Sequence, residues 1–171
     1  MKLEAAQQIA DRVKAALAPY CERIEVAGSV RRRKPEPHDI DMVCVPRTFM
    51  LTDMLGPTGV SERDKGFWIA VNGLGAVLKG EPRAGKLIQL DIEGVNVEIF
   101  VATRDNWGLM LAIRTGPAGY SHHVLAHGWV RNGYHSIDGM MTKSGMPVPV
   151  REERDLFAIA GVEWMPPEQR T

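Results

Sequence analysis

Two aspartates one residue apart, Asp39 and Asp41, are the residues of this sequence best placed to carry chemistry. They open the stretch DIDMVCVP (residues 39–46), whose apolar run predicts a strand. Because residues i and i+2 of a strand point to the same face, both carboxylates should point the same way. Two carboxylates this close repel each other unless a cation lies between them. Hard oxygen ligands at this spacing suit Mg²⁺, which also binds phosphates, so the pair predicts a metal site for phosphate chemistry.

A third carboxylate on a neighbouring strand would complete a two-metal site for displacement at phosphorus. Residues 86–102 alternate apolar and polar side chains around positions 93–94, which predicts a hairpin. With a two-residue turn, Gln89 lies opposite Glu98, and Glu98 shares its face with Asp91. Both Glu98 and Asp91 are therefore candidates for the third metal ligand.

A Gly-Ser pair and a basic run, GSVRRRKPEPH, stand directly before the aspartates. A triphosphate is strongly negative and would be repelled by a bare carboxylate cluster. Its β and γ phosphates would be held by backbone N–H groups at Gly28 and Ser29, by the Ser29 hydroxyl, and by one of Arg31, Arg32 or Arg33. We therefore expect a nucleoside triphosphate as a partner. Taken singly, each feature also fits a solvated surface charge or a turn.

Composition sets broad limits on the remaining possibilities. Of the 171 residues, 44% are apolar and 25% are charged, as in ordinary globular proteins. The 21 Lys and Arg residues balance 21 Asp and Glu residues, so a nucleic-acid surface must be a local patch. No apolar stretch reaches membrane-spanning length, and the N-terminus is too polar for a signal peptide. We expect a cytoplasmic monomer with no membrane partner.

Hydrophobic periodicity around these residues predicts an α+β protein. We expect helices over residues 2–18, 61–80, 106–114, 119–131 and 151–160. We expect strands from residue 23 to Gly28 and over 39–46, 86–92 and 95–102, and a hairpin-like stretch over 133–147. Residues 31–38 should be a loop, residues 47–60 irregular, and residues 164–171 extended. A soft boundary near residue 104 would separate an α/β lobe from a smaller helical lobe.

The stretch GSVRRRKPEPHDID resembles the Gly-Ser…Asp-x-Asp signature of the polymerase β-like nucleotidyltransferases, with the spacing used by family X DNA polymerases. Three further stretches resemble that branch: VEIFVATRDNWGLMLAIRTG, YSHHVLAHGWVRNGY and REERDLFAIAGVEWMPPEQR. The resemblance implies a palm domain over residues 1–104, built on a small mixed sheet flanked by helices. It implies a small, mainly helical nucleotide-selecting (thumb/fingers) domain over residues 105–171, as in the minimal viral members. The lyase and duplex-gripping domains that usually precede the palm have no counterpart here.

The resemblance also implies roles for single residues. Asp39, Asp41 and Glu98 would be the catalytic residues and would bind two Mg²⁺ ions, with Mn²⁺ as a substitute. In family X the third acid lies seventeen residues before the Thr of Thr-Gly, which from Thr115 reaches Glu98. The usual acid there is Asp, so Asp91 stays as an alternative.

Nucleotide recognition is implied by the same matching. The residues that would bind the nucleotide are Gly28, Ser29, Arg32, Thr115, Gly116 and Ser121. Of these, Ser29 and Arg32 would contact the triphosphate, and Ser121 would lie near the incoming base. The family has an unusual cis peptide just after the Thr-Gly pair, so we expect a cis Gly116–Pro117 bond.

Two further features depart from the family pattern or stand outside it. The aromatic pair before Thr-Gly is replaced by Ile113-Arg114, which implies lax discrimination between sugars. His122, His123 and His127 fall on one expected helix, and the last two have a zinc-compatible i,i+4 spacing. Without a third ligand in reach, we expect these histidines to face the core or DNA.

The activity implied is that of a DNA polymerase adding nucleotides to a primer 3′-hydroxyl, of the short-gap repair type. Its partners would be a nucleoside triphosphate and a primer–template or gapped DNA. One alternative is untemplated nucleotidyl transfer to RNA, protein or a small molecule. Another is an inactive module that binds nucleotides or nucleic acid.

Overall fold

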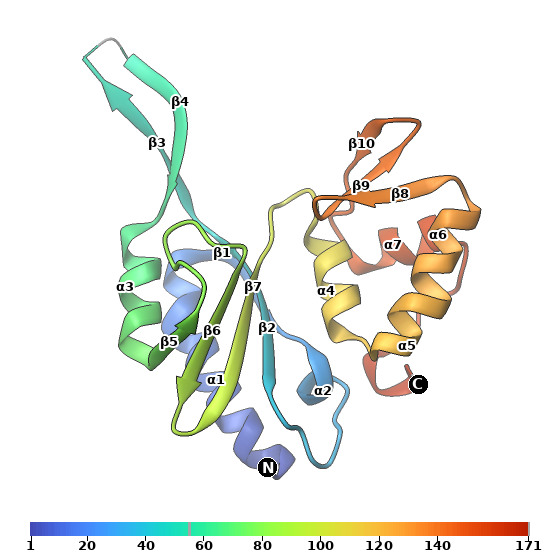
Figure 1. Ribbon diagram of the computed structural model, residues 1–171, viewed down its shortest axis with the longest axis horizontal. Helices are drawn as coiled ribbons and strands as arrows, with labels where there is room; N and C mark the ends of the chain where they lie inside the picture. Colours follow the sequence, from blue (N-terminus) through green and yellow to red (C-terminus); the bar gives the residue numbers. More distant parts are fainter. Residues whose placement is uncertain (55, 171) are drawn as a thin grey trace.

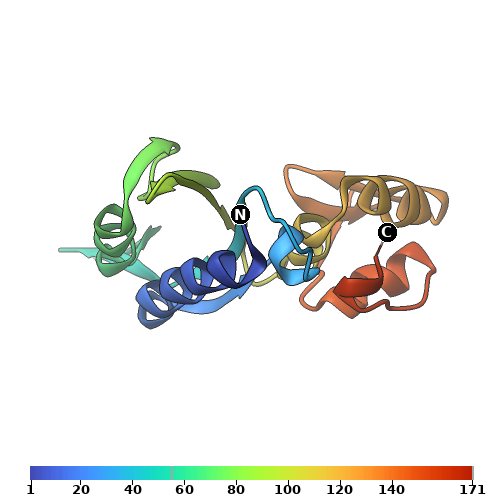
Figure 2. The same ribbon diagram turned by 90° about the horizontal axis from the view of Figure 1, so that it is seen from below.

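A mixed sheet is the framework of the first part of the chain (Figure 1). The structure is a computed structural model that describes residues 1–54 and 56–170. In spatial order, the strands of this sheet are β1 (Cys21–Val26), β2 (Ile40–Pro46), β7 (Val95–Val101), β6 (Leu87–Ile92) and β5 (Ala76–Lys79). Helices α1 (Leu3–Leu17) and α3 (Lys65–Leu74) cover one face (Figures 1 and 2). Together with the helical C-terminal region described below, this architecture confirms the α+β class.

Alternating side chains of β2 and β7 give the sheet two different faces. Ile40, Met42 and Ile99 point into the core under α1 and α3. Val43 and Phe100 point to the opposite face, where they pack with helix α4 (Trp107–Thr115). Because strand side chains alternate, Asp41 and Glu98 also lie on this second face. The apolar core of the sheet thus fixes the direction of the acidic side chains.

The hairpin of β6 and β7 forms as the sequence predicts. Its turn has two residues, Glu93 and Gly94, both with positive φ, as a tight hairpin turn of this kind requires. Gln89 is the cross-strand partner of Glu98, which confirms the predicted register. On its other side β7 pairs in parallel with β2, and in that ladder Asp41 is the partner of Glu98.

Residues 47–80 differ from the sequence prediction. The expected irregular segment forms a hairpin of β3 (Thr48–Asp53) and β4 (Gly56–Arg63), which projects from the sheet (Figure 1). The expected helix over 61–80 is wrong at both ends, because β4 runs into it and β5 follows it. Asp64 caps α3, its carboxylate accepting the Gly66 N–H at 2.7 Å.

A close approach of two backbones explains where α3 ends. A side chain at Gly75 would lie 2.2 Å from the carbonyl oxygen of Asp91, so only glycine fits between helix and sheet. From there the chain continues as β5 along the edge of the sheet, paired with β6.

The C-terminal region packs helices around a second core and carries a small antiparallel sheet. Its helical segments are α4, α5 (Ala118–Tyr120), a π-helical turn (Ser121–Ala126), α6 (His127–Arg131) and α7 (Glu153–Ala160). Its strands are β8 (Tyr134–Ile137), β9 (Met140–Lys143) and β10 (Met146–Val148). The expected extended tail contains a short 3₁₀ turn at Pro167–Gln169 instead. The domain boundary at residues 104–105 stays a prediction, and residue 171 of the expected second domain lies outside the described residues.

A buried charge network joins α2 (Gly28–Arg31) to the C-terminal region. The Glu153 carboxylate accepts two hydrogen bonds from Arg31, at 2.7 and 3.0 Å, and one from Arg170 at 2.8 Å. Arg170 is fully buried, and its guanidinium also donates to the Met165 carbonyl. Arg31 donates in addition to the Thr115 hydroxyl at 2.6 Å. This network fixes the C-terminal helices against the loop that precedes the aspartates.

Of the helices in residues 1–54 and 56–170, none is both long and apolar enough to cross a membrane.

The charge network gives a stability prediction. Burial raises the pKa of Glu153, but hydrogen bonds from Arg31 and Arg170 outweigh it and hold the pKa below its ordinary value of 4.5. A depressed folded-state pKa means that this stabilisation is present above the ordinary pKa and is lost as the pH falls below it. Glu153→Gln should lower the free energy of unfolding at neutral pH by about 3 kcal/mol, because it leaves a buried cation unpaired.

Urea unfolding of Glu153→Gln and the wild type, followed from about pH 7 to about pH 3, checks this. The two stabilities should converge as the pH falls. Glu168→Gln is the matched control, because that acid is half exposed and lies 3.7 Å from Arg33. It should change stability by less than about 0.5 kcal/mol. Equal effects of both substitutions would contradict the assigned role of Glu153.

Candidate active site

One cleft of about 270 Å³ lies between the second face of the sheet and the start of the C-terminal helices. It is lined by Gly28, Ser29, Arg32, Asp39, Asp41, Glu98, Phe100, Ile113, Arg114, Gly116, Pro117 and Ala118. The lining therefore includes all three predicted acids and most of the residues expected to bind a nucleotide. These residues come from segments separated by up to about ninety positions in the sequence.

The acids come from two neighbouring strands. Asp41 and Glu98 are partners in the parallel ladder of β2 and β7, and Asp39 directly precedes β2. Burial and, after it, the charges of Asp39 and Glu98 together raise the pKa of Asp41 to about 7, against the opposing charges of Arg114 and Arg32. The three carboxylates therefore interact strongly. These carboxylates are hard oxygen donors whose negative charge is only partly neutralised by nearby arginines. Such a set is chemically suited to divalent Mg²⁺ or Mn²⁺.

Gly28 allows the loop to approach the acids. Its φ is +58°, and a Cβ atom there would lie 1.8 Å from Oδ2 of Asp41. The Ala27 N–H donates to the Asp41 carbonyl at 2.8 Å, which continues the ladder of β1 and β2 up to this point. The Gly-Ser pair is thus held directly beside the acidic cluster, and any larger residue at position 28 would displace Asp41.

Ser29 and Arg32 present unused donors to the cleft. The Ser29 hydroxyl oxygen and the Arg32 Nε are buried and have no hydrogen-bond partner among the described residues. Burial lowers the pKa of Arg32, and the nearby Asp41 and Asp39 oppose that shift. Buried donors without partners are costly, so a bound anion would relieve both. These orphaned donors fit the phosphates of a nucleotide.

The three arginines of the basic run have different partners. Arg31 is committed to Glu153 and Thr115. Arg33 is exposed and only 3.7 Å from Glu168. Arg32 lines the cleft and donates through Nη1 to the Thr115 carbonyl. The geometry therefore favours Arg32 as the phosphate ligand that the sequence left open.

Gly116 of the Thr-Gly pair lies on the opposite wall, whereas Thr115 is not part of the lining. Thr115 is fully buried, with its hydroxyl and its carbonyl both bound to arginines of the basic run. Gly116 lines the cleft, and the bond between Gly116 and Pro117 is cis, which confirms that prediction.

Besides Thr115, two candidate residues lie outside this lining. Ser121 is buried, and its hydroxyl donates to the Ile113 carbonyl at 3.1 Å. Its contact with an incoming base stays a prediction. The Asp91 carboxylate accepts the Gly94 N–H at 2.7 Å in the hairpin turn, and Asp91 does not line the cleft. Of the two candidate third ligands, Glu98 is the one that the fold brings to Asp41.

Two residues near the cleft have roles that sequence reasoning missed. Gln89 donates from Nε2 to Oε1 of Glu98 at 2.6 Å, and so orients that carboxylate. The predicted hairpin register already placed the two residues opposite each other, so the signal was available. Arg114 lies over the Phe100 ring, 3.9 Å from its centroid, and faces the cleft. Its positive charge helps to keep Asp41 ionised.

Comparison with known proteins agrees with the resemblance seen in the sequence. Residues 110–171 match the family model of the DNA polymerase beta thumb. No curated protein gave a significant match to the chain. A thumb of this kind indicates a function related to that of family X polymerases, and in general the binding of DNA and nucleotides. Divalent metals are the usual cofactors of such polymerases. By this match, residues 110–171 are a polymerase beta thumb domain, the kind of domain found in the family X polymerases.

Proposed function

We propose that this protein is a metal-dependent nucleotidyltransferase that extends a primer 3′-hydroxyl, as a DNA polymerase for short gaps. One observation carries the proposal. A single cleft brings Asp39, Asp41 and Glu98 to one wall and the unpaired donors of Ser29 and Arg32 beside them. The opposite wall is formed by residues near the start of the segment that matches the polymerase beta thumb. Acids for metals, donors for phosphates and a thumb are the parts that templated nucleotide addition needs.

The acids would hold the metals. Asp39 and Asp41 would hold the two Mg²⁺ ions, or Mn²⁺ in their place, and Glu98 would serve the catalytic one. When bound, the two ions neutralise the developing charge and lower the pKa of the attacking hydroxyl. The raised pKa of Asp41 supports this assignment, because a cation would relieve the repulsion from Asp39 and Glu98. Gln89 keeps the Glu98 carboxylate pointed into the cleft.

The loop would bind and orient the nucleotide. The Ser29 hydroxyl and the Arg32 Nε would donate to the β and γ phosphates. Thr115 and Gly116 would lie beneath the sugar and base. In the reaction, the primer 3′-oxygen forms a bond to the α-phosphorus as the bond to the β-phosphate bridging oxygen breaks, and pyrophosphate leaves. The protein contributes mainly positioning and charge stabilisation.

The wall beneath the sugar also bears on substrate choice. Ile113 and Arg114 line the cleft where many family members carry an aromatic pair. A flexible charged side chain excludes a 2′-hydroxyl less well than a rigid ring. We therefore expect weak discrimination between deoxyribonucleotides and ribonucleotides.

The acceptor is tested with three substrates: a gapped duplex, a recessed primer and a single strand. Each is offered with dNTPs or rNTPs and with Mg²⁺ or Mn²⁺, and extension is read on a denaturing gel. The proposal expects template-matched extension of the gapped duplex, which stops when EDTA removes the metal. Addition to the single strand without regard to template would favour untemplated transfer. No incorporation under any condition would leave only a binding module.

Removing one acid should separate activity from stability. Asp41→Asn should reduce nucleotide incorporation to background, because the shared metal ligand is lost. Since the folded-state pKa of Asp41 is about 7 and its ordinary value is 3.8, this group lowers the stability of the metal-free fold progressively as the pH rises from about 4 to about 7, and the full loss is present above pH 7. The same substitution should therefore raise metal-free stability at alkaline pH by about 1 kcal/mol, or ~2–4 °C in Tm. Calorimetry in EDTA measures the second effect, and a lower Tm for the variant would contradict the acid cluster.

The third metal ligand is tested by a matched pair of neutral substitutions. Glu98→Gln should lower kcat by about 100-fold or more while keeping the fold, since glutamine can still bond to Gln89. Asp91→Asn should change kcat by less than about twofold, because Asp91 serves the hairpin turn and not the cleft. Single-turnover incorporation with saturating nucleotide measures both. The reverse ranking would assign the role to Asp91.

A further inference from the structure

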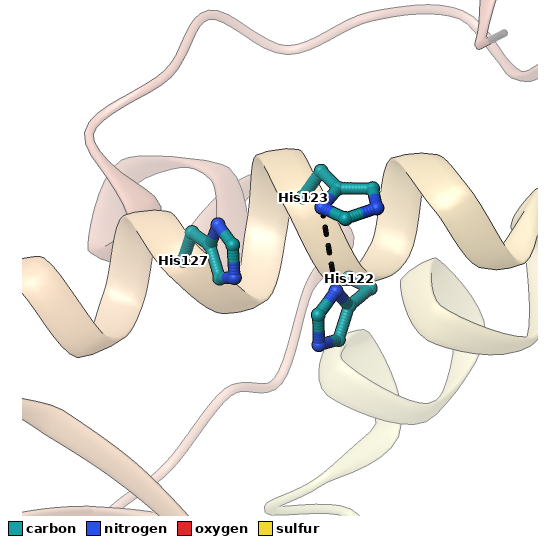
Figure 3. A group of neighbouring side chains, drawn as sticks. All are labelled: His122, His123 and His127. Atoms are coloured by element: carbon teal, nitrogen blue, oxygen red, sulfur yellow. Dashed lines mark hydrogen bonds between the residues drawn. The ribbon is translucent and has the colours of Figure 1, made fainter.

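Three histidines lie together on the outside of the C-terminal region, away from the acids just described. His122, His123 and His127 are all exposed, and their rings face one another (Figure 3). One nitrogen from each ring lies within 4.8 Å of the others. The sequence placed only His123 and His127 together, so the structure adds the missing third member.

A π-helical turn is what adds His122. In a regular α-helix, residues five apart lie about 140° from each other around the axis. Here the N–H of His127 donates to the carbonyl of His122, which is the i→i+5 bond of a π-helix. The two rings consequently lie on the same side, tilted by 60° to each other, with centroids 4.9 Å apart. Such turns are rare in α-helices and are frequent at functional sites.

The spacing of the ring nitrogens fits a tetrahedral cation. Zinc bonds imidazole nitrogen at about 2.0–2.1 Å, so two ligands of a tetrahedral ion lie about 3.4 Å apart. The Nδ1 atoms of His122 and His123 are 3.4 Å apart. Two imidazole nitrogens this close need a proton or a cation between them. A nitrogen of the His127 ring lies within 4.8 Å of both other rings' nitrogens.

The surroundings leave the three rings available to an ion. Within residues 1–54 and 56–170, their hydrogen-bonding and ring contacts are with one another, with no carboxylate among them. Imidazole ligands suit zinc and its neighbours in the first transition row, whereas carboxylates suit magnesium. The histidine cluster and the acidic cleft therefore differ in the metal that they would take.

We propose that His122, His123 and His127 form a binding site for a divalent transition metal, Zn²⁺ above all. Three imidazoles leave a fourth position of the tetrahedron open to water or to an oxygen of another molecule. The ion would also tie the π-helical turn to the first residue of α6. This proposal does not depend on the proposed function, because no residue of the acidic cleft takes part in it.

The test uses the full chain without a histidine tag and with Mg²⁺ in large excess, so that the acidic cleft does not take the probe metal. Co²⁺ is titrated first, because a tetrahedral site with nitrogen ligands gives an intense visible band. Zn²⁺ is then added to displace it. The wild type should bind one equivalent of Co²⁺ with that band, and Zn²⁺ should abolish the band.

His127→Ala and His122→Ala should each weaken metal binding by about tenfold or more, or about 1.4 kcal/mol. His135→Ala is the matched control: it is also exposed, lies in β8 and is not part of the cluster, so its binding should equal that of the wild type. Because all substituted side chains are exposed, circular dichroism should show an unchanged fold. Equal binding by all variants, or an octahedral cobalt spectrum in the wild type, would overturn the proposal.

Discussion

The ion pairs of Glu153 with Arg31 and Arg170 are the interaction on which the site depends. They are buried and join the loop before the aspartates to the last helix and the C-terminal tail. Because the same Arg31 also donates to the Thr115 hydroxyl, these ion pairs hold Thr115 in place, directly before Gly116 on the wall opposite the acids. They add to the apolar contact of Val43 and Phe100 with α4, which also holds the sheet against the helical region. A buried ion pair of this kind serves orientation more than net stability.

The sheet supplies the second constraint. Apolar residues on one face of β2 and β7 force Asp41 and Glu98 onto the other, where their charges oppose each other and that of Asp39. The fold therefore holds an arrangement that is unfavourable without a counter-ion. The nearby positive charges of Arg114 and Arg32 offset only part of the repulsion among the three carboxylates. The metal-free protein spends stability on a site that is complete only when cations and a nucleotide are present.

Local patterns predicted the parts of the fold that depend on neighbouring residues. Alternation predicted the β6–β7 hairpin and the pairing of Gln89 with Glu98. The Gly-Ser and Asp-x-Asp spacing predicted five of the twelve residues that line the cleft. The features that the sequence did not predict are those set by contacts between residues far apart in the chain, or by features that leave no sequence pattern. The side chains of β3 are exposed throughout, so no pattern marked that hairpin. The partners of Arg31 are more than eighty residues away, and only the π-helical turn brings His122 to His127.

Arg32 has two tasks that meet in one side chain. One of its terminal nitrogens holds the backbone carbonyl of Thr115, while its buried Nε has no partner among the described residues and the side chain lines the cleft. A ligand that pulls on this guanidinium therefore also pulls on the far wall, through a single rigid planar group. One guanidinium therefore connects the ligand side of the cleft with the backbone of Thr115. A lysine, with one charged nitrogen, has no second arm with which to transmit that signal.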